Sequence, residues 1–314
     1  MQLIVKSSPH INNKHNTQSI MLDVIIALMP ALIVGIIVLG IRSLLVVSLS
    51  IVSAVLCEFL YCVITKKKNT ILDLSAVVTG LLLAMTLPAS VPLWQVVVGN
   101  IFAIIVIKKL FGGIGKNIFN PALSARAFLM LIYPAGLTIY YALGVDAVSS
   151  STPLHHMVMP ALPNESLLDM FLGNCPGSIG EISALALLLG LGYLVARKVI
   201  SLRIPLSYIF TVFLVTLVFS KTDSPIKWSL YSILSGGVML GAIFMATDYT
   251  TSPVTPKGQI IFGIGCGILT VFIRYNGLFP EGVTYAILIM NSLVWIIEQI
   301  TMPRRFGKKG GILA

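Results

Sequence analysis

The sequence predicts an all-α integral membrane protein with about ten transmembrane helices. Of its 314 residues, 57% are hydrophobic and only 10% are charged, whereas a soluble domain carries roughly 25% charged residues. The mean hydropathy is +0.97, and apolar runs close to the ~20 residues of a spanning helix recur along the whole chain. A surface with so few charges would not stay in water, so lipid is the expected solvent.

Ten apolar runs mark the expected helices. They cover residues 21–40, 43–64, 73–88, 94–111, 121–134, 179–196, 204–220, 228–246, 259–274 and 282–301. The first run is too long for the core of a signal peptide, and no small-residue cleavage site stands out, so we interpret it as the first span. The ten runs leave little sequence for a separate soluble domain.

The two halves of the chain resemble each other weakly. Residues 115–122 follow the fourth run and residues 275–282 follow the ninth, at an offset of about 160 residues. Because five spans is an odd number, related halves would lie in opposite orientations in the membrane. We therefore expect a 5+5 inverted repeat, with the first repeat over 1–134, a connecting loop over 135–178 and the second repeat over 179–314.

Basic residues predict the orientation. With the N-terminus inside, the expected inner segments hold 16 Lys and Arg residues, among them Lys108 and Lys109, and the outer segments hold 4, among them Arg274. Cytoplasmic loops carry the excess of Lys and Arg. Both termini are therefore expected in the cytoplasm and the loop 135–178 outside, in the cell (cytoplasmic or inner) membrane.

The net charge of +10 does not indicate nucleic-acid binding. The basic residues form short runs between apolar segments and no basic helix is interleaved with aromatic residues. The cysteines do not predict a metal site, because Cys57, Cys62, Cys175 and Cys266 include no C-x-x-C pair and three of them lie in apolar runs. Such cysteines are usually small buried hydrophobes.

Ionisable residues within the apolar runs, or at their ends, are the first candidates for function. They are Asp23, Glu58, Asp73, Arg126, Asp248, Glu281 and Glu298. Each costs ~2.5–3.5 kcal/mol at the centre of a spanning helix, although most lie near a run end, where the cost is small.

Four of these acids are candidates for an ion path. We expect Glu58, Asp73 and Asp248 to face a polar interior, with Glu281 near the outer exit. The suggested repeat would bring Asp73 and Asp248 near a shared axis on the cytoplasmic side. The alternative is a structural pair with Arg126 or with a helix terminus.

A motif in the outer loop predicts a covalent cofactor. Asp146, Ser149 and Thr152 have the spacing Asp-x-x-Ser-x-x-Thr. This spacing resembles the sequence at which a dedicated flavin transferase links flavin mononucleotide (FMN) to a threonine through a phosphoester. Ser150 and Ser151 stand where such motifs usually have Gly-Ala, which makes Ser151 a competing acceptor, but both residues are small enough to leave Thr152 within reach.

Longer stretches resemble one membrane family. They are GGIGKNIFNPA at 112–122, ATDYTTSPVTPKGQ at 246–259, IRYNG at 273–277 and PEGVTYAILIMN at 280–291. Together with the flavin motif they are similar to the D subunit of the Rnf-type ion-translocating oxidoreductase, a family related to the B subunit of the sodium-translocating NADH:quinone reductase. The quinone-reductase protein has a long N-terminal extension, whereas here the first run starts about 20 residues from Met1, which favours the Rnf protein.

The resemblance implies a flavoprotein subunit of a membrane complex. The complex would pass electrons between reduced ferredoxin and NAD and couple them to Na⁺ or H⁺ transport. Ferredoxin and NAD would bind to partner subunits, so this chain alone would not be catalytic. Its own task would be to place flavins and to tune them electrostatically.

The resemblance also implies two flavins. FMN would be bound to Thr152 on the outer side, and the outer loop contains no Lys or Arg to retain its phosphate non-covalently. Related subunits hold a non-covalent riboflavin toward the cytoplasmic side, where we expect residues 115–126. Asn117, Asn120 and Arg126 are the candidate ligands there, and the alternative is that Asn120 merely caps the helix that follows it.

Other classes of function remain open at this point. A component of a quinone reductase would share most of these motifs. A secondary transporter or channel would suit inverted repeats and buried carboxylates equally well, but it would have no use for a flavin motif. A purely structural membrane scaffold would have no need of acids within its spans.

Overall fold

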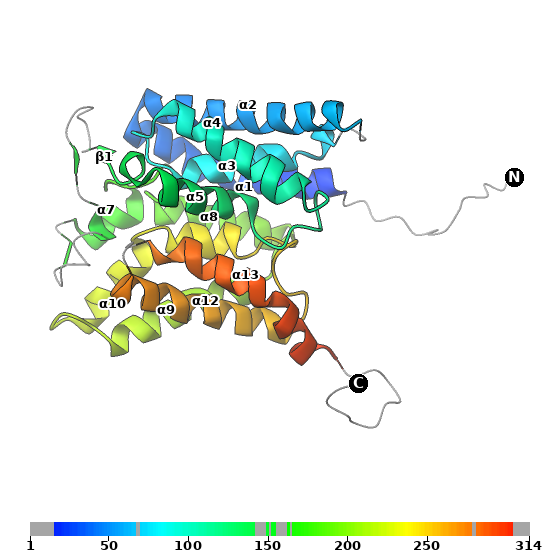
Figure 1. The fold of residues 1–314 in the computed structure, drawn as a ribbon. Coiled ribbons are helices and arrows are strands. Elements are labelled where there is room, and N and C mark those ends of the chain that lie inside the picture. Colours follow the sequence, from blue (N-terminus) through cyan, green and yellow to red (C-terminus); the bar gives the residue numbers. More distant parts are fainter. Residues whose placement is uncertain are drawn as a thin grey trace, which may run out of the picture.

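The structure, a computed structural model, is built from helices that run roughly side by side (Figure 1). It describes residues 16–66, 70–141, 149–150, 152–154, 162–163, 165–277 and 281–303. The strands found in this part are β1 (Tyr140–Tyr141) and β2 (Ser149–Ser150), which pair antiparallel with Tyr140 opposite Ser150. Nearly all other regular structure is helical.

The helices of the first half follow the predicted apolar runs. They are α1 (Thr17–Leu39), α2 (Ile41–Ile64), η1 (Ile71–Asp73), α3 (Ser75–Thr86), α4 (Leu93–Ile101), η2 (Phe102–Lys109), α5 (Pro121–Ile132) and η3 (Pro134–Gly136). The η2 segment continues α4 as a π-helix, a rare geometry that occurs frequently at functional sites.

The helices of the second half begin with a short one in the connecting loop. They are α7 (Leu167–Leu172), α8 (Ala184–Ala196), α9 (Arg203–Val218), α10 (Pro225–Leu234), α11 (Val238–Leu240), η4 (Gly241–Met245), α12 (Pro256–Asn276) and α13 (Gly282–Thr301). The chain bends by 62° between α10 and the segment 238–245. Gly236 and Gly237 make this break with φ angles of 64° and 70°, a conformation that glycine adopts without steric cost.

The described helices include four that are long and apolar enough to span a membrane, α1, α2, α12 and α13, or five if the bent pair at α10 counts as one span. Four further apolar helices, α3, α5, α8 and α9, have 10–17 residues. The structure is therefore that of a helical integral membrane protein with several apolar helices. The number of ten crossings stays a prediction, because several predicted runs are short or broken helices.

Large apolar side chains on the outside of the bundle fit a lipid environment. Ile37, Phe272 and Trp295 are 75%, 62% and 68% exposed, and they belong to three of the spanning helices. A water-soluble protein rarely exposes large contiguous apolar patches. The side chains buried between the helices are equally apolar, with Leu28 and Phe262 fully enclosed.

The two halves pack against each other through two helix pairs, α1 with α8 and α5 with α13. Within the first half, α2 packs on α3 and α4, and within the second half, α9 packs on α10 and α12. At the α1–α8 crossing, a Cβ at Gly190 would clash with the backbone carbonyl oxygen of Ala27. Glycine is thus required there for the close approach of two backbones, as is common between membrane helices.

The bundle has two opposite ends, which can be followed in Figure 1. We use the name terminal face for one of these ends. There α1, α5 and α12 begin, and α2 and α13 end. We call the opposite end, which carries β1 and α7, the loop face.

Candidate functional site

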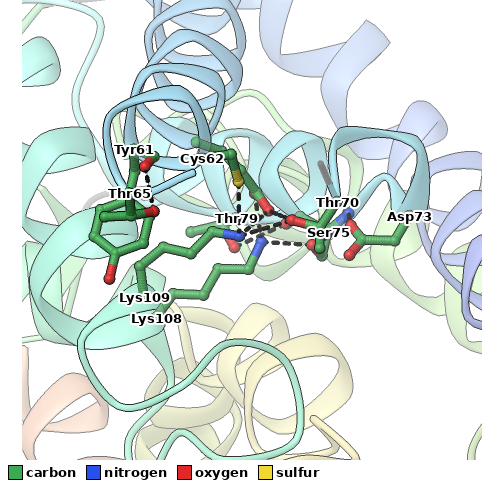
Figure 2. A network of polar contacts seen from close by, with 10 residues as sticks. Tyr61, Cys62, Thr65, Thr70, Asp73, Ser75, Thr79, Lys108 and Lys109 are labelled. Atoms are coloured by element: carbon green, nitrogen blue, oxygen red, sulfur yellow. Dashed lines mark hydrogen bonds and ion pairs between the residues drawn. The ribbon is translucent and has the colours of Figure 1, made fainter. Parts of the chain in front are cut away.

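The most deeply buried charges lie at the terminal face, around Glu58. This side chain of α2 is 0% exposed. Its Oε2 lies 2.6 Å from Nζ of Lys108 and its Oε1 lies 2.7 Å from Nζ of Lys109. The hydroxyl of Thr70 also donates to Oε1. Figure 2 shows the two lysines reaching side by side into this network, so Glu58 faces a polar interior in which cations hold both of its oxygens.

Lys108 and Lys109 correct an assumption made from the sequence. From the sequence, both count among the basic residues of the inner segments, but in the structure they are only 2% and 8% exposed. They end the π-helical segment η2, in which the amide of Leu110 donates to the carbonyl of Ile105, five residues earlier, at 3.0 Å. Because a π-turn is wider than an α-turn, two consecutive side chains can be directed to one partner. No local pattern marks this geometry in the sequence.

Asp73 joins the same network through Ser75. Its Oδ1 accepts the backbone N–H of Ser75 at 2.9 Å and also the Ser75 hydroxyl. That hydroxyl accepts in turn from Lys108, so Asp73 and Glu58 are linked by one serine and one lysine. A cavity of about 270 Å³ adjoins them, lined by both carboxylates, both lysines and Gly112–Gly113.

Asn117, Asn120 and Asp248 line a second cavity of about 90 Å³ between the two halves. Lys108 lines both cavities. The structure thus brings Asp73 and Asp248 to neighbouring cavities of the same face. Each carboxylate bonds within its own turn, since Asp248 accepts the amide of Thr250 at 3.2 Å.

The two asparagines of this second cavity differ in whether their side-chain oxygens have hydrogen-bond partners. Oδ1 of Asn120 accepts from the amides of Ala122 and Leu123 at 3.0 and 3.3 Å, so Asn120 does cap α5. Asn117 donates to the Thr250 hydroxyl at 3.4 Å, but its buried Oδ1 has no hydrogen-bond partner among the described residues. This acceptor is available to a ligand that carries an N–H or O–H group.

Arg126 does not join the asparagines. It forms an ion pair with Glu281, the residue before α13, and donates to the carbonyl of Thr86 at the end of α3. The hydroxyl of Tyr140 donates to Oε1 of Glu281 at 2.7 Å. Burial, with a smaller contribution from the Glu181 carboxylate, raises the pKa of Tyr140 to about 12, so this hydroxyl keeps its proton. Arg126 and Glu281 therefore link the two halves close to the loop face.

Arg274 is a second buried arginine, and it too was counted from the sequence as an outer charge. It is 8% exposed and donates to the carbonyls of Ser232, Ser235 and Gly236 at 2.6, 2.8 and 3.1 Å. These carbonyls end α10 at its break. The sequence carries no sign of this role, because an arginine near a span end is normally solvated.

Thr152 lies at the loop face and is partly exposed. Two residues later, Leu154 is buried against Gly236. Of the other motif residues, Asp146 lies outside the described residues, and Ser149 is described only by its backbone in β2. Among the described residues, no group of three or more His, Cys, Asp or Glu side chains could hold a metal ion.

Comparison with known proteins gives full-length matches. A family model described as NQR2, RnfD, RnfE matches residues 4–307. The D subunit of the Na⁺-translocating ferredoxin:NAD⁺ oxidoreductase complex of Acetobacterium woodii is 48% identical over 311 residues, which cover 98% of this chain and 96% of the relative. The D subunit of the proton-translocating ferredoxin:NAD⁺ oxidoreductase complex of Clostridium ljungdahlii is 41% identical, over 97% and 96% of the two chains.

A third relative is more distant. The D subunit of the ion-translocating oxidoreductase complex of Stutzerimonas stutzeri is 37% identical over 94% of this chain and 93% of its own length. The resemblance to the Rnf-type D subunit that the motifs indicated is thereby confirmed. The chain belongs to the NQR2, RnfD, RnfE family.

Proposed function

We propose that this chain is the membrane-embedded D subunit of an ion-translocating ferredoxin:NAD⁺ oxidoreductase complex. The observation that carries the proposal is the identity of 48% over nearly the whole of both chains. The chain is one component of a translocase, works with the other components of its complex and is not catalytic alone. Charged side chains buried among apolar helices are costly and usually mark paths for ions or protons, as a component of a translocase needs.

The chain would carry FMN on Thr152, linked through a phosphoester by a flavin transferase. Thr152 fits this role because it is partly exposed on the loop face, within reach of a modifying enzyme. FMN, when bound, supplies one- and two-electron redox chemistry. The protein residues around Thr152 would fix its position and exclude other reactions.

The test is the flavin fluorescence of the chain on a denaturing gel. Thr152→Ala should abolish it, because the phosphoester acceptor is removed. The matched control is Ser151→Ala, which deletes the neighbouring hydroxyl and should leave the fluorescence intact. Unchanged fluorescence in Thr152→Ala, or loss in Ser151→Ala alone, would refute the assignment to Thr152.

A non-covalent riboflavin would bind at the terminal face beside Asn117 and Asn120. The unpaired Oδ1 of Asn117 supports this site. The cavity of about 90 Å³ is smaller than the roughly 300–1,000 Å³ of typical ligand sites. A flavin ring would therefore require the lining side chains to move apart. Arg126, which faces the loop-face cluster, would not be a direct ligand.

Ion transport would use the carboxylates that line or adjoin the two terminal cavities. Asp73 and Asp248 border them, with Glu58 deeper in the bundle and Glu281 toward the loop face. Burial raises the pKa of Asp248, which favours proton uptake by its carboxylate. Either Na⁺ or H⁺ is compatible with such a set of oxygen ligands.

The arrangement of the halves would be a 5+5 inverted repeat over 1–134 and 179–314, joined by the loop 135–178. The matching packing within each half supports this proposal, since α2 contacts α3 and α4 as α9 contacts α10 and α12. The chain would lie in the cell membrane with the terminal face in the cytoplasm and the loop face outside.

A further inference from the structure

Thr152 lies between two attachments to the helix bundle, each two residues away. On one side, Ser150 pairs with Tyr140 in the β1–β2 ladder. On the other side, the buried side chain of Leu154 packs on Gly236. The segment that contains Thr152 is thus fastened at both ends, although Thr152 itself is partly exposed.

The first attachment leads to the junction of the two halves. Tyr140 is 8% exposed, and its hydroxyl donates to Glu281 at 2.7 Å. Glu281 pairs with Arg126, which also binds the last carbonyl of α3, that of Thr86. Strand β1 is therefore connected to α5, α13 and the end of α3 through three polar contacts in series.

The second attachment leads to the break in the other half. Leu154 contacts Gly236, whose carbonyl accepts from Arg274 at 3.1 Å. Arg274 also binds two further carbonyls at the end of α10. Both attachments thus reach the carboxyl end of a short or broken helix that a buried arginine caps, α3 through Arg126 and α10 through Arg274.

Residues of the two capped ends line one small cavity. Its volume is about 20 Å³, and Thr86, Arg126, Gly236 and Gly237 are among the lining residues. Close-packed groups of this kind transmit displacement rather than absorb it. A shift of either helix end would therefore move its attachment to the Thr152 segment.

We propose that Tyr140 and Leu154 are positioning residues that hold Thr152 from both sides, at a fixed place over the two arginine-capped helix ends. The proposal deepens the proposed function, on which it rests for the flavin phosphoester at Thr152. Neither residue takes part in electron transfer itself. Their contribution is to keep the attached group at one distance and one orientation relative to the bundle.

The anchoring is tested on the purified complex by hydrogen–deuterium exchange of the peptide containing residues 149–154. Tyr140→Phe removes only the hydroxyl and should speed exchange there on the order of fivefold, the factor expected for one lost hydrogen bond. Leu154→Ala should act similarly, and Leu154→Met should restore most of the protection. The two changes together should raise exchange beyond the product of the single effects, because each attachment alone still holds one end.

A matched control and a flavin readout separate anchoring from general loosening. Tyr231→Phe deletes a hydroxyl that donates to the carbonyl of Glu165 at 2.9 Å, near the same face, and should leave residues 149–154 unchanged. In the double variant the fluorescence anisotropy of the covalent flavin should fall, while its stoichiometry by intact mass stays the same.

Unchanged exchange and anisotropy in the double variant, with flavin still attached, would overturn the anchoring and leave the proposed function intact. Faster exchange in a chain whose mass shows no flavin on Thr152 would support the anchoring and refute the attachment.

Discussion

The carboxylate of Glu58 and the ammonium group of Lys108 lie 2.6 Å apart, although 50 residues separate them in the sequence. Both side chains are buried, and Lys109 adds a second ammonium group to the same carboxylate. Removing two charges from water is unfavourable, and attraction offsets this cost only where the geometry is good and further hydrogen bonds satisfy the remaining donors. Thr70 and Ser75 supply such bonds.

Glu58→Gln should destabilise the protein strongly, because two buried ammonium groups would lose their shared carboxylate. Breaking a buried pair in this way typically costs about 3–5 kcal/mol. The midpoint of thermal unfolding in detergent measures the effect. The matched control is Glu298→Gln, which alters a carboxylate that accepts the amide of exposed Val254. Equal midpoints for the two variants would contradict a structural role for the Glu58 pair.

Arg126 and Glu281 should show strong energetic coupling. Either Arg126→Gln or Glu281→Gln leaves one charge without its partner, whereas the double variant leaves none. A double-mutant cycle on unfolding should therefore give a coupling of about 1–3 kcal/mol. The pair of Arg197 and Asp23, in which the arginine side chain is 51% exposed, should give a clearly smaller coupling. Additive effects at Arg126 and Glu281 would argue that the halves are not joined there.

Asp73→Asn and Asp248→Asn should impair ion pumping more than electron transfer. Each amide keeps the shape of the carboxylate but removes its charge, so a bound cation would lose its counter-charge. Ion uptake into vesicles and the rate of NAD reduction are measured on the same preparation of the complex. Asp169→Asn, on α7 at the loop face, is the control. Variants that assemble and pump at the wild-type rate would place the ion path in partner subunits.

Riboflavin released on denaturation should depend on the two asparagines of the terminal face. Asn117→Ala removes the unpaired acceptor, and Asn120→Ser removes the amide while a serine can still cap α5. Both should lower the riboflavin content of the purified complex. Because Asn120→Ser still caps α5, a loss of riboflavin in that variant would not result from unfolding of the helix. Full retention in the two variants would refute the site.

The two faces should react with an impermeant maleimide from opposite sides of the membrane. Lys257→Cys lies exposed at the terminal face, and Leu168→Cys replaces a side chain that is 71% exposed on α7. In intact cells only Leu168→Cys should react. The native cysteines are buried, and burial raises the pKa of the Cys175 thiol to about 12. Because the thiolate is the reactive form, Cys175 should stay unlabelled at neutral pH. Labelling of Lys257→Cys in intact cells would reverse the proposed orientation.

The positions of the helices were largely predictable from the sequence, because apolar runs and Gly or Pro boundaries are local signals. The run predicted at 228–246 is the instructive exception. Its composition is that of one span, but Gly236 and Gly237 take positive φ angles and divide it into two segments at 62°. Composition alone does not distinguish a straight span from a broken one.

The partners of the charged residues were not predictable in the same way. A lysine or arginine near the end of an apolar run can extend to water or turn inward, and both choices leave the same sequence pattern. Lys108 turns inward because it meets a carboxylate 50 residues away, and Arg274 because it meets the carbonyls at the end of α10, at least 38 residues away. Only the tertiary structure brings these groups together.

The arginine caps on α3 and α10 affect how well the protein keeps water and ions from crossing the membrane. Free carbonyls at a helix end inside hydrocarbon normally need water or a protein donor. A guanidinium group carries five N–H donors. Arg126 uses one terminal nitrogen for the carbonyl of Thr86 and the other for Glu281, and the two terminal nitrogens of Arg274 donate to the carbonyls at the end of α10. The carbonyls that these two side chains cap therefore need no water as a partner. A protein complex that builds an ion gradient loses part of it if continuous water crosses the membrane through the complex. By satisfying carbonyls at the two interrupted helix ends, Arg126 and Arg274 remove groups that would otherwise attract such water.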